Sequence, residues 1–161
     1  MTSPDAGVET EVELVELDLP AKPEVVAVAR LVVGALAAAD PMFSEDRAAD
    51  LRLAVSEACT NAIQAQRSRS NGSTVIEPIN LRFELTPGCI AVTVEDHGGG
   101  FDPGELTTHP NITDPERLHH EGGLGIPLLQ FLTDDLEFKA TEEGTVVAMT
   151  FLSRADDGFE H

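Results

Sequence analysis

Tryptophan and tyrosine are absent from this sequence, and cysteine occurs only twice. Cys59 and Cys89 lie in apolar periodic stretches without a CxxC neighbour, which gives no support for a disulfide framework or a zinc site. We therefore expect both thiols to be buried. No run approaches the roughly 20 apolar residues that a membrane-spanning helix needs, and the acidic N-terminus lacks the basic and apolar parts of a signal peptide. These absences predict a cytoplasmic protein without a membrane partner.

Basic residues are also scarce, because 10 lysines and arginines stand against 29 aspartates and glutamates, for a formal net charge of -19. Such a surface repels phosphate backbones and anionic lipids, so direct nucleic-acid binding is disfavoured. Any nucleotide that the protein binds must be neutralised locally by a cation and by backbone donors. Most of the carboxylates are expected to form a solvated acidic surface.

The apolar pattern changes period several times along a chain of 161 residues, the length of one ordinary domain. Alternation predicts strands and helical spacing predicts helices. The expected strands are 14–19, 79–85, 90–94, 136–140 and 146–151, and the expected helices are 23–36, 44–67 and 125–131. Strands grouped together with interposed helices predict an α+β fold, a two-layer α/β sandwich with helices on one face of a mixed, mainly antiparallel sheet.

We expect this single domain to span residues 13–153, between a disordered tail at 1–12 and a flexible tail at 154–161. Residues 102–121 have no sustained period and contain three prolines. A loop of that length in a compact domain is usually functional or disordered, so this segment is predicted to be a mobile lid.

Glu57 and Asn61 are four residues apart in the second predicted helix, so their side chains project from the same face. An amide oxygen suits Mg²⁺, which takes few protein ligands when substrate phosphates supply the others. A carboxylate one turn away can accept a proton from an attacking hydroxyl. The pair therefore predicts a metal ligand at Asn61 and a general base at Glu57. Taken alone, such a pair is common, and a solvated or capping pair is the alternative.

Two glycine-rich segments lie where a nucleotide could bind. Residues 96–101, DHGGGF, end a predicted strand, where Asp96 can accept a hydrogen bond from the adenine amine and glycines let the backbone pass close to the base. Residues 122–125, GGLG, open a helix whose exposed amides and positive end can meet phosphates. Neither has Walker or Rossmann spacing. Taken singly, a turn closed by an Asx motif and a plain helix start or hinge are the alternatives.

In their order, these elements resemble the N box and the two glycine boxes of the gyrase, chaperone, histidine-kinase and mismatch-repair ATPases. EACTNAI at 57–63, VEDHGGGFDP at 94–103 and GGLGIPLLQFLTDDLEF at 122–138 look most like the bacterial anti-sigma factor serine/threonine kinases. The resemblance runs from about Leu17 to Leu152. It implies the Bergerat-type ATP-binding fold, Mg-ATP binding, and phosphorylation of a serine or threonine on a small STAS-type anti-sigma factor antagonist. It also implies binding of a sigma factor, and homodimerisation as in its relatives.

Carried over to this chain, the resemblance makes Glu57 the base, Asn61 the magnesium ligand and Asp96 the adenine reader. Thr145 resembles a family threonine beside adenine, for which an ordinary β-branched strand residue is the alternative. Arg30 matches a family arginine that contacts partner proteins, although an exposed helix arginine needs no such task. The candidate nucleotide-binding residues are therefore Asn61, Asp96, Gly98, Gly100, Phe101, Gly122, Gly123, Leu124, Gly125 and Thr145.

One departure from the family pattern is Ala65, where members commonly carry a histidine one turn after the magnesium asparagine. This difference keeps open a second hypothesis, a non-catalytic ATP-binding module that regulates a partner by nucleotide-dependent binding. Glu57 and Asn61 favour the kinase. The ATP-binding half of a histidine kinase is less favoured because no upstream helix carries a phosphorylatable histidine, and a topoisomerase-type fragment lacks its transducer domain.

Overall fold

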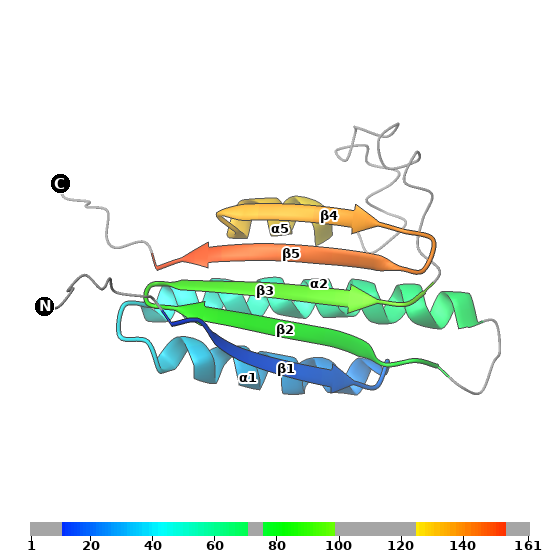
Figure 1. Ribbon diagram of the computed structural model, residues 1–161, viewed down its shortest axis with the longest axis horizontal. Coiled ribbons are helices and arrows are strands. Elements are labelled where there is room, and N and C mark those ends of the chain that lie inside the picture. Colours follow the sequence, from blue (N-terminus) through cyan, green and yellow to red (C-terminus); the bar gives the residue numbers. More distant parts are fainter. Residues whose placement is uncertain (1–10, 71–75, 99–124, 154–161) are drawn as a thin grey trace, which may run out of the picture.

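The computed structural model describes residues 11–70, 76–98 and 125–153 (Figure 1). In these ranges three α-helices pack on one face of a five-stranded sheet with the order β1-β2-β3-β5-β4 (Figure 1). The strands are β1 (Glu13–Leu19), β2 (Ile79–Thr86), β3 (Cys89–Asp96), β4 (Asp135–Ala140) and β5 (Thr145–Leu152), and the helical elements are a 3₁₀ turn η1 (Pro23–Val25), α1 (Val26–Ala38), α2 (Glu45–Ser70) and α5 (Gly125–Leu132). This arrangement confirms the predicted two-layer α+β sandwich.

All four strand pairings in the described ranges are antiparallel, so no parallel pair of the expected mixed sheet is found there. The hairpin between β2 and β3 turns at Pro87 and Gly88, and Gly88 has a φ of 75°, a conformation that glycine adopts without strain. Ser44 Oγ accepts the amide of Arg47 at 3.0 Å and so caps the start of α2.

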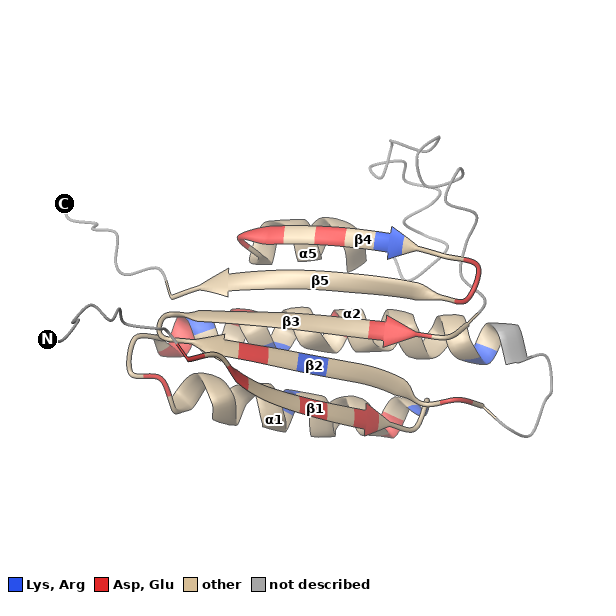
Figure 2. Cartoon of the chain, in the orientation of Figure 1, with Lys and Arg blue, Asp and Glu red and all other residues tan. Residues whose placement is uncertain are grey.

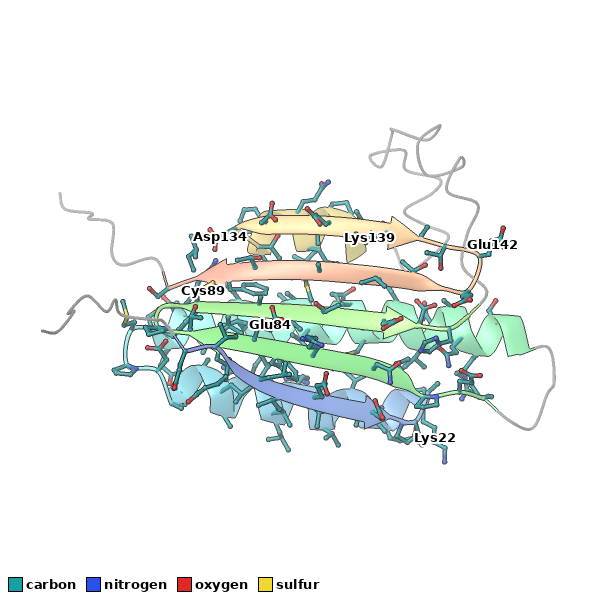
Figure 3. All side chains as sticks on the ribbon, in the orientation of Figure 1. Lys22, Glu84, Cys89, Asp134, Lys139 and Glu142 are labelled. Carbon is teal, nitrogen blue, oxygen red and sulfur yellow. The ribbon has the colours of Figure 1, made fainter. Side chains whose placement is uncertain are left out.

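The core lies between the sheet and the helices because alternate residues of the central strands are apolar and are buried on the face that the helices cover (Figure 1). Its largest fully buried side chains come from β2, β3, β5, α1, α2 and α5: Phe83, Phe151, Leu51, Ile79, Leu81, Ile90, Leu129, Met149, Val33, Val55, Val92 and Val94. Of the two cysteines, Cys59 is buried as predicted. The prediction is wrong for Cys89, which is only half-buried at the start of β3 (Figure 3). None of the described helices is long and apolar enough to cross a membrane.

Arg47 is a charged residue inside this core, with only 3% of its surface exposed. Its guanidinium donates to the carbonyl of Leu132 at 2.9 Å and to that of Leu152 at 2.8 Å, and it also pairs with Asp50 and Asp134. Asp134 lies at the entry to β4 (Figure 3). One side chain at the start of α2 therefore holds the ends of α5 and β5 in place.

Charged side chains lie on the other strands, in the loops and on α2, whereas α1 carries a single charge, Arg30, and α5 and β5 carry none (Figure 2). Arg30 is exposed. The described structure thus combines two helices of low charge, α1 and α5, with the acidic surface that the composition predicts.

Candidate active site

The central helix α2 presents Glu57 and Asn61 to the first turn of α5. A Cβ atom added at Gly125 would lie 3.1 Å from Asn61 Nδ2 and 3.4 Å from Glu57 Oε1. Gly125 is buried, and both polar side chains are half-buried. The structure therefore brings together two elements that are far apart in the sequence, the E-x-x-x-N pair and the last glycine of the GGLG segment.

Asp96 ends β3 with 5% of its surface exposed. It faces Thr145 across the β3–β5 ladder, and its Oδ1 accepts the amide of Gly98 at 3.0 Å. Burial raises the pKa of Asp96, while hydrogen bonds from the Gly98 and Thr145 amides oppose this rise. The Asx motif considered as an alternative is thus present, and it holds the carboxylate in a defined orientation.

Two glycines allow the backbone around Asp96 to pack closely. A Cβ atom at Gly144 would lie 1.9 Å from the carbonyl oxygen of Asp96, and one at Gly98 would lie 2.8 Å from the carbonyl oxygen of Ala65. Cβ atoms do not approach other atoms this closely in proteins, so both positions require glycine. Gly98 was among the predicted site residues and Gly144 was not, although Gly144 directly precedes the predicted Thr145.

Gln66 is a second residue that the sequence reasoning missed. It is buried on α2, and its Oε1 accepts the amide of His97, the residue after Asp96, at 2.7 Å. The available signal was a polar residue four positions after the apolar Ala62, at the spacing of one helix face.

The remaining predicted site residues are separate from this cluster or lie outside the described ranges. Arg30 lies on α1. The predicted lid at 102–121, most of the N-terminal tail, all of the C-terminal tail, and Gly100, Phe101, Gly122, Gly123 and Leu124 fall outside the described residues. Within the described ranges, no group of three or more His, Cys, Asp or Glu side chains could hold a metal ion.

The sequence matches the histidine kinase-like ATPase domain family over residues 19–151. The chain belongs to this family. It is 35% identical over 147 residues to the serine-protein kinase RsbW of Bacillus pumilus (strain SAFR-032), which is 89% of this chain and 88% of the relative. It is 34% identical over 143 residues to RsbW of Bacillus subtilis (strain 168), which is 86% of this chain and 84% of the relative.

A solved structure has the same fold. The RsbU and RsbW domains of Rv1364c from Mycobacterium tuberculosis match with a TM-score of 0.61 at 18% identity, covering 88% of this chain and 33% of that chain. The predicted resemblance to the anti-sigma factor kinases of the histidine kinase-like ATPase superfamily is therefore confirmed. This membership makes ATP the ligand to consider at the cluster formed by α2, the end of β3 and the start of α5.

Proposed function

We propose that the protein is an ATP-dependent serine/threonine kinase that acts as an anti-sigma factor. In this role it phosphorylates an anti-sigma factor antagonist and sequesters a sigma factor. The observation that carries the proposal is the position of Glu57 and Asn61 against the first turn of α5, in a chain related to serine-protein kinases over nearly its whole length. A carboxylate, an amide and the start of a helix therefore lie side by side. Groups of these kinds can position the phosphates and the attacking hydroxyl in phosphoryl transfer.

Adenine binding is assigned to Asp96. Its carboxylate is held by the amides of Gly98 and Thr145, and it is a pure acceptor when ionised. The exocyclic amine of adenine is a donor, so the two groups are complementary. Thr145 faces Asp96 across the β3–β5 ladder and is assigned to the same adenine-binding position.

Phosphate binding is assigned to the amides of the second glycine segment and to Mg²⁺. The oxygens of Asn61 and Glu57 are the hard donors that suit this ion, and Asn61 is the proposed ligand. When bound, the ion neutralises charge on the phosphate oxygens. Asn61 lies beside Gly125, so a metal ligand and the phosphate-binding helix start are adjacent.

Glu57 is the proposed general base. It accepts the proton of a serine or threonine hydroxyl on the antagonist as the hydroxyl oxygen attacks the γ-phosphorus, and ADP leaves with the electrons of the broken bond. Its half-buried position one helical turn from Asn61 places it beside the proposed metal ligand. Glu57 and Asn61 thus serve different steps from one helix face.

The remaining assignments concern partners and location. The proposed partners are a sigma factor and a small STAS-type antagonist, with Arg30 on α1 as a partner-binding residue, and no direct nucleic-acid or membrane contact. A homodimer and a cytoplasmic location complete the proposal. The similarity to RsbW proteins supports the assignments of partners, dimer and location. The net charge of -19 supports the absence of direct nucleic-acid and membrane contact.

The test is Glu57→Gln, which keeps the side-chain shape but cannot take up a proton near neutral pH. We expect Mg-ATP affinity to be retained and phosphotransfer to the genomically adjacent antagonist to fall by about 10²- to 10⁴-fold. The assay measures label on the antagonist after incubation with labelled ATP. Glu45→Gln, an exposed substitution at the start of the same helix, is the matched control and should transfer at the wild-type rate.

Two outcomes would change the assignment. A wild-type protein that binds ATP tightly but labels no antagonist would be the non-catalytic ATP-binding module, the alternative that Ala65 keeps open. Wild-type transfer by Glu57→Gln would leave a kinase whose base is another group.

A further inference from the structure

The carboxamide of Gln66 connects three parts of the fold. Only 3% of Gln66 is exposed. Its Oε1 accepts the His97 amide at 2.7 Å, and its Nε2 donates to the carbonyl oxygens of Glu77 and Pro78, the latter at 3.5 Å. Helix α2, the residue after β3 and the segment entering β2 are therefore joined through one side chain.

The loop after Asp96 is held from two further directions. The backbone of Gly98 packs so closely on α2 that an added Cβ atom would lie 2.8 Å from the carbonyl oxygen of Ala65. On the other side, the ring Nε2 of His97 lies 2.6 Å from Asn80 Oδ1, and Asn80 Nδ2 donates to Asp18 at 2.5 Å. The main chain of His97 is thus held by α2 and its side chain by β2.

These contacts bear directly on the orientation of Asp96. Its Oδ1 accepts the Gly98 amide at 3.0 Å, so the direction of the carboxylate depends on where residues 97 and 98 lie. Without Gln66, the His97 amide would lose its acceptor and would have to move to find another, because a buried unsatisfied amide is costly. A shift of His97 and Gly98 would carry the Asp96 carboxylate with it.

We propose that Gln66 is a positioning residue of the nucleotide site, which sets the Asp96 carboxylate for adenine and couples it to the helix that carries Glu57 and Asn61. This inference rests on the proposed ATP site and adds to it a residue that touches no nucleotide. It predicts an effect on base selectivity as well as on stability. Guanine presents an oxygen where adenine presents its amine, so a correctly oriented Asp96 favours ATP over GTP.

The first test replaces the amide by an apolar chain of similar length, Gln66→Met, with Gln64→Met as the matched control. Gln64 is exposed two residues earlier on the same helix. Affinities for ATP and GTP are measured by calorimetry with excess Mg²⁺, and thermal unfolding is followed in parallel. We expect ATP affinity to fall about 10-fold, as for the loss of one buried hydrogen bond, and GTP affinity to change little. The ATP-to-GTP ratio should therefore fall in Gln66→Met and stay at the wild-type value in Gln64→Met.

A second variant keeps the inference testable if Gln66→Met does not fold. In Gln66→Glu, a protonated carboxyl can donate its single proton to the Glu77 carbonyl and accept the His97 amide, whereas an ionised carboxylate would face the Glu77 and Pro78 carbonyl oxygens without a proton. Burial favours the neutral form. ATP affinity relative to wild type should recover as the pH falls from about 8 to about 5.5.

Nearby groups also titrate, so each pH point is expressed relative to wild type at that pH. The charged or titratable groups around position 66 in the described ranges are Asp96 and His97 at the end of β3, Glu77 before β2, and Arg67 on α2. The positioning role of Gln66 would be overturned by an unchanged ATP-to-GTP affinity ratio in Gln66→Met, or by a loss of ATP affinity in Gln66→Glu that does not depend on pH. Either result would leave the proposed function in place. A wild-type protein that binds no ATP would overturn both this inference and the proposed function.

Discussion

Asp96 shows how one residue can be unfavourable for the fold and useful for binding. Burial raises the pKa of its carboxyl, and two backbone amides oppose the rise by donating to it. The free-energy cost of burying an acceptor in a fixed direction is offset when a bound ligand donates a hydrogen bond to it. An acceptor held in a fixed direction at the end of a strand is the kind of group that the proposed adenine site needs.

The corresponding prediction concerns Asp96→Asn, which replaces a pure acceptor by an amide that can present an N–H to the adenine amine. We expect ATP affinity to fall by about 10-fold or more, since a hydrogen bond to a charged group contributes roughly 1.5–3 kcal/mol. Titration calorimetry with Mg-ATP measures the effect. Glu95→Gln, on the opposite face of β3, should bind like wild type. Equal affinities in the two variants would remove Asp96 from the adenine site.

The two cysteines differ in burial and so in reactivity. Burial raises the pKa of the Cys59 thiol to about 12, which leaves almost no thiolate near pH 8, whereas Cys89 is only half-buried. We expect a disulfide reagent at pH 8 to modify one thiol per native molecule and both thiols in denaturant. The substitution Cys89→Ser should abolish the rapid native reaction. Two thiols that react at equal rates in the native protein would contradict the buried position of Cys59.

Among the elements, α5 combines a short length with an important position. Its 8 residues begin beside Glu57 and Asn61, and its last carbonyl accepts from Arg47. A helix this short has little stability of its own, so its placement depends on packing and on such anchors. Arg47 also stacks on Phe151, with 5.4 Å between the guanidinium carbon and the ring centroid.

We therefore expect Arg47→Met to lower the free energy of unfolding by about 3 kcal/mol or more, because it removes the buried ion pair with Asp134 and the hydrogen bonds from Arg47 to the carbonyls of Leu132 and Leu152. Urea denaturation followed by circular dichroism is the measurement. The control is Arg82→Met. Arg82 is 49% exposed and pairs with Glu16 and Glu84 on the strands, so this change should cost about 1 kcal/mol or less. Equal losses would show that Arg47 is not the anchor of α5.

At the scale of the whole molecule, the net charge of -19 opposes the binding of a polyanion. The sequence contains no Walker lysine, so the phosphates depend on backbone amides and on a cation. We expect ATP affinity in excess chelator to be at least about 10-fold lower than with Mg²⁺. Adenosine, which has no phosphates, is the control ligand and should bind equally in both conditions.

A substitution at Asn61 distinguishes the loss of the proposed metal ligand from the general screening of phosphate charge by Mg²⁺. Asn61→Leu removes the amide oxygen and should gain little affinity for ATP when Mg²⁺ is added, while it binds adenosine like wild type. Equal affinity of wild type for ATP with and without chelator would remove Asn61 from its assigned role.

The sequence by itself determined the class of fold and the family, because both depend on local patterns. Alternation in β2 and β3, the serine cap of α2 and the glycine turn at Gly88 are set by neighbouring residues and backbone chemistry. The order of the three motifs is likewise a property of the chain. It was enough to assign Glu57, Asn61 and Asp96 to one candidate site.

Only the tertiary structure decided which polar residues are buried and which glycines are pressed against other backbone. Gln66 and Arg47 look like ordinary helix residues in the sequence, and Gly144 looks like part of a turn. Their roles come from partners distant in the chain: His97 and Glu77 for Gln66, and the ends of α5 and β5 for Arg47. The physical reason is that side-chain type sets what a group can bond to, while packing alone sets whether water or another part of the chain satisfies it.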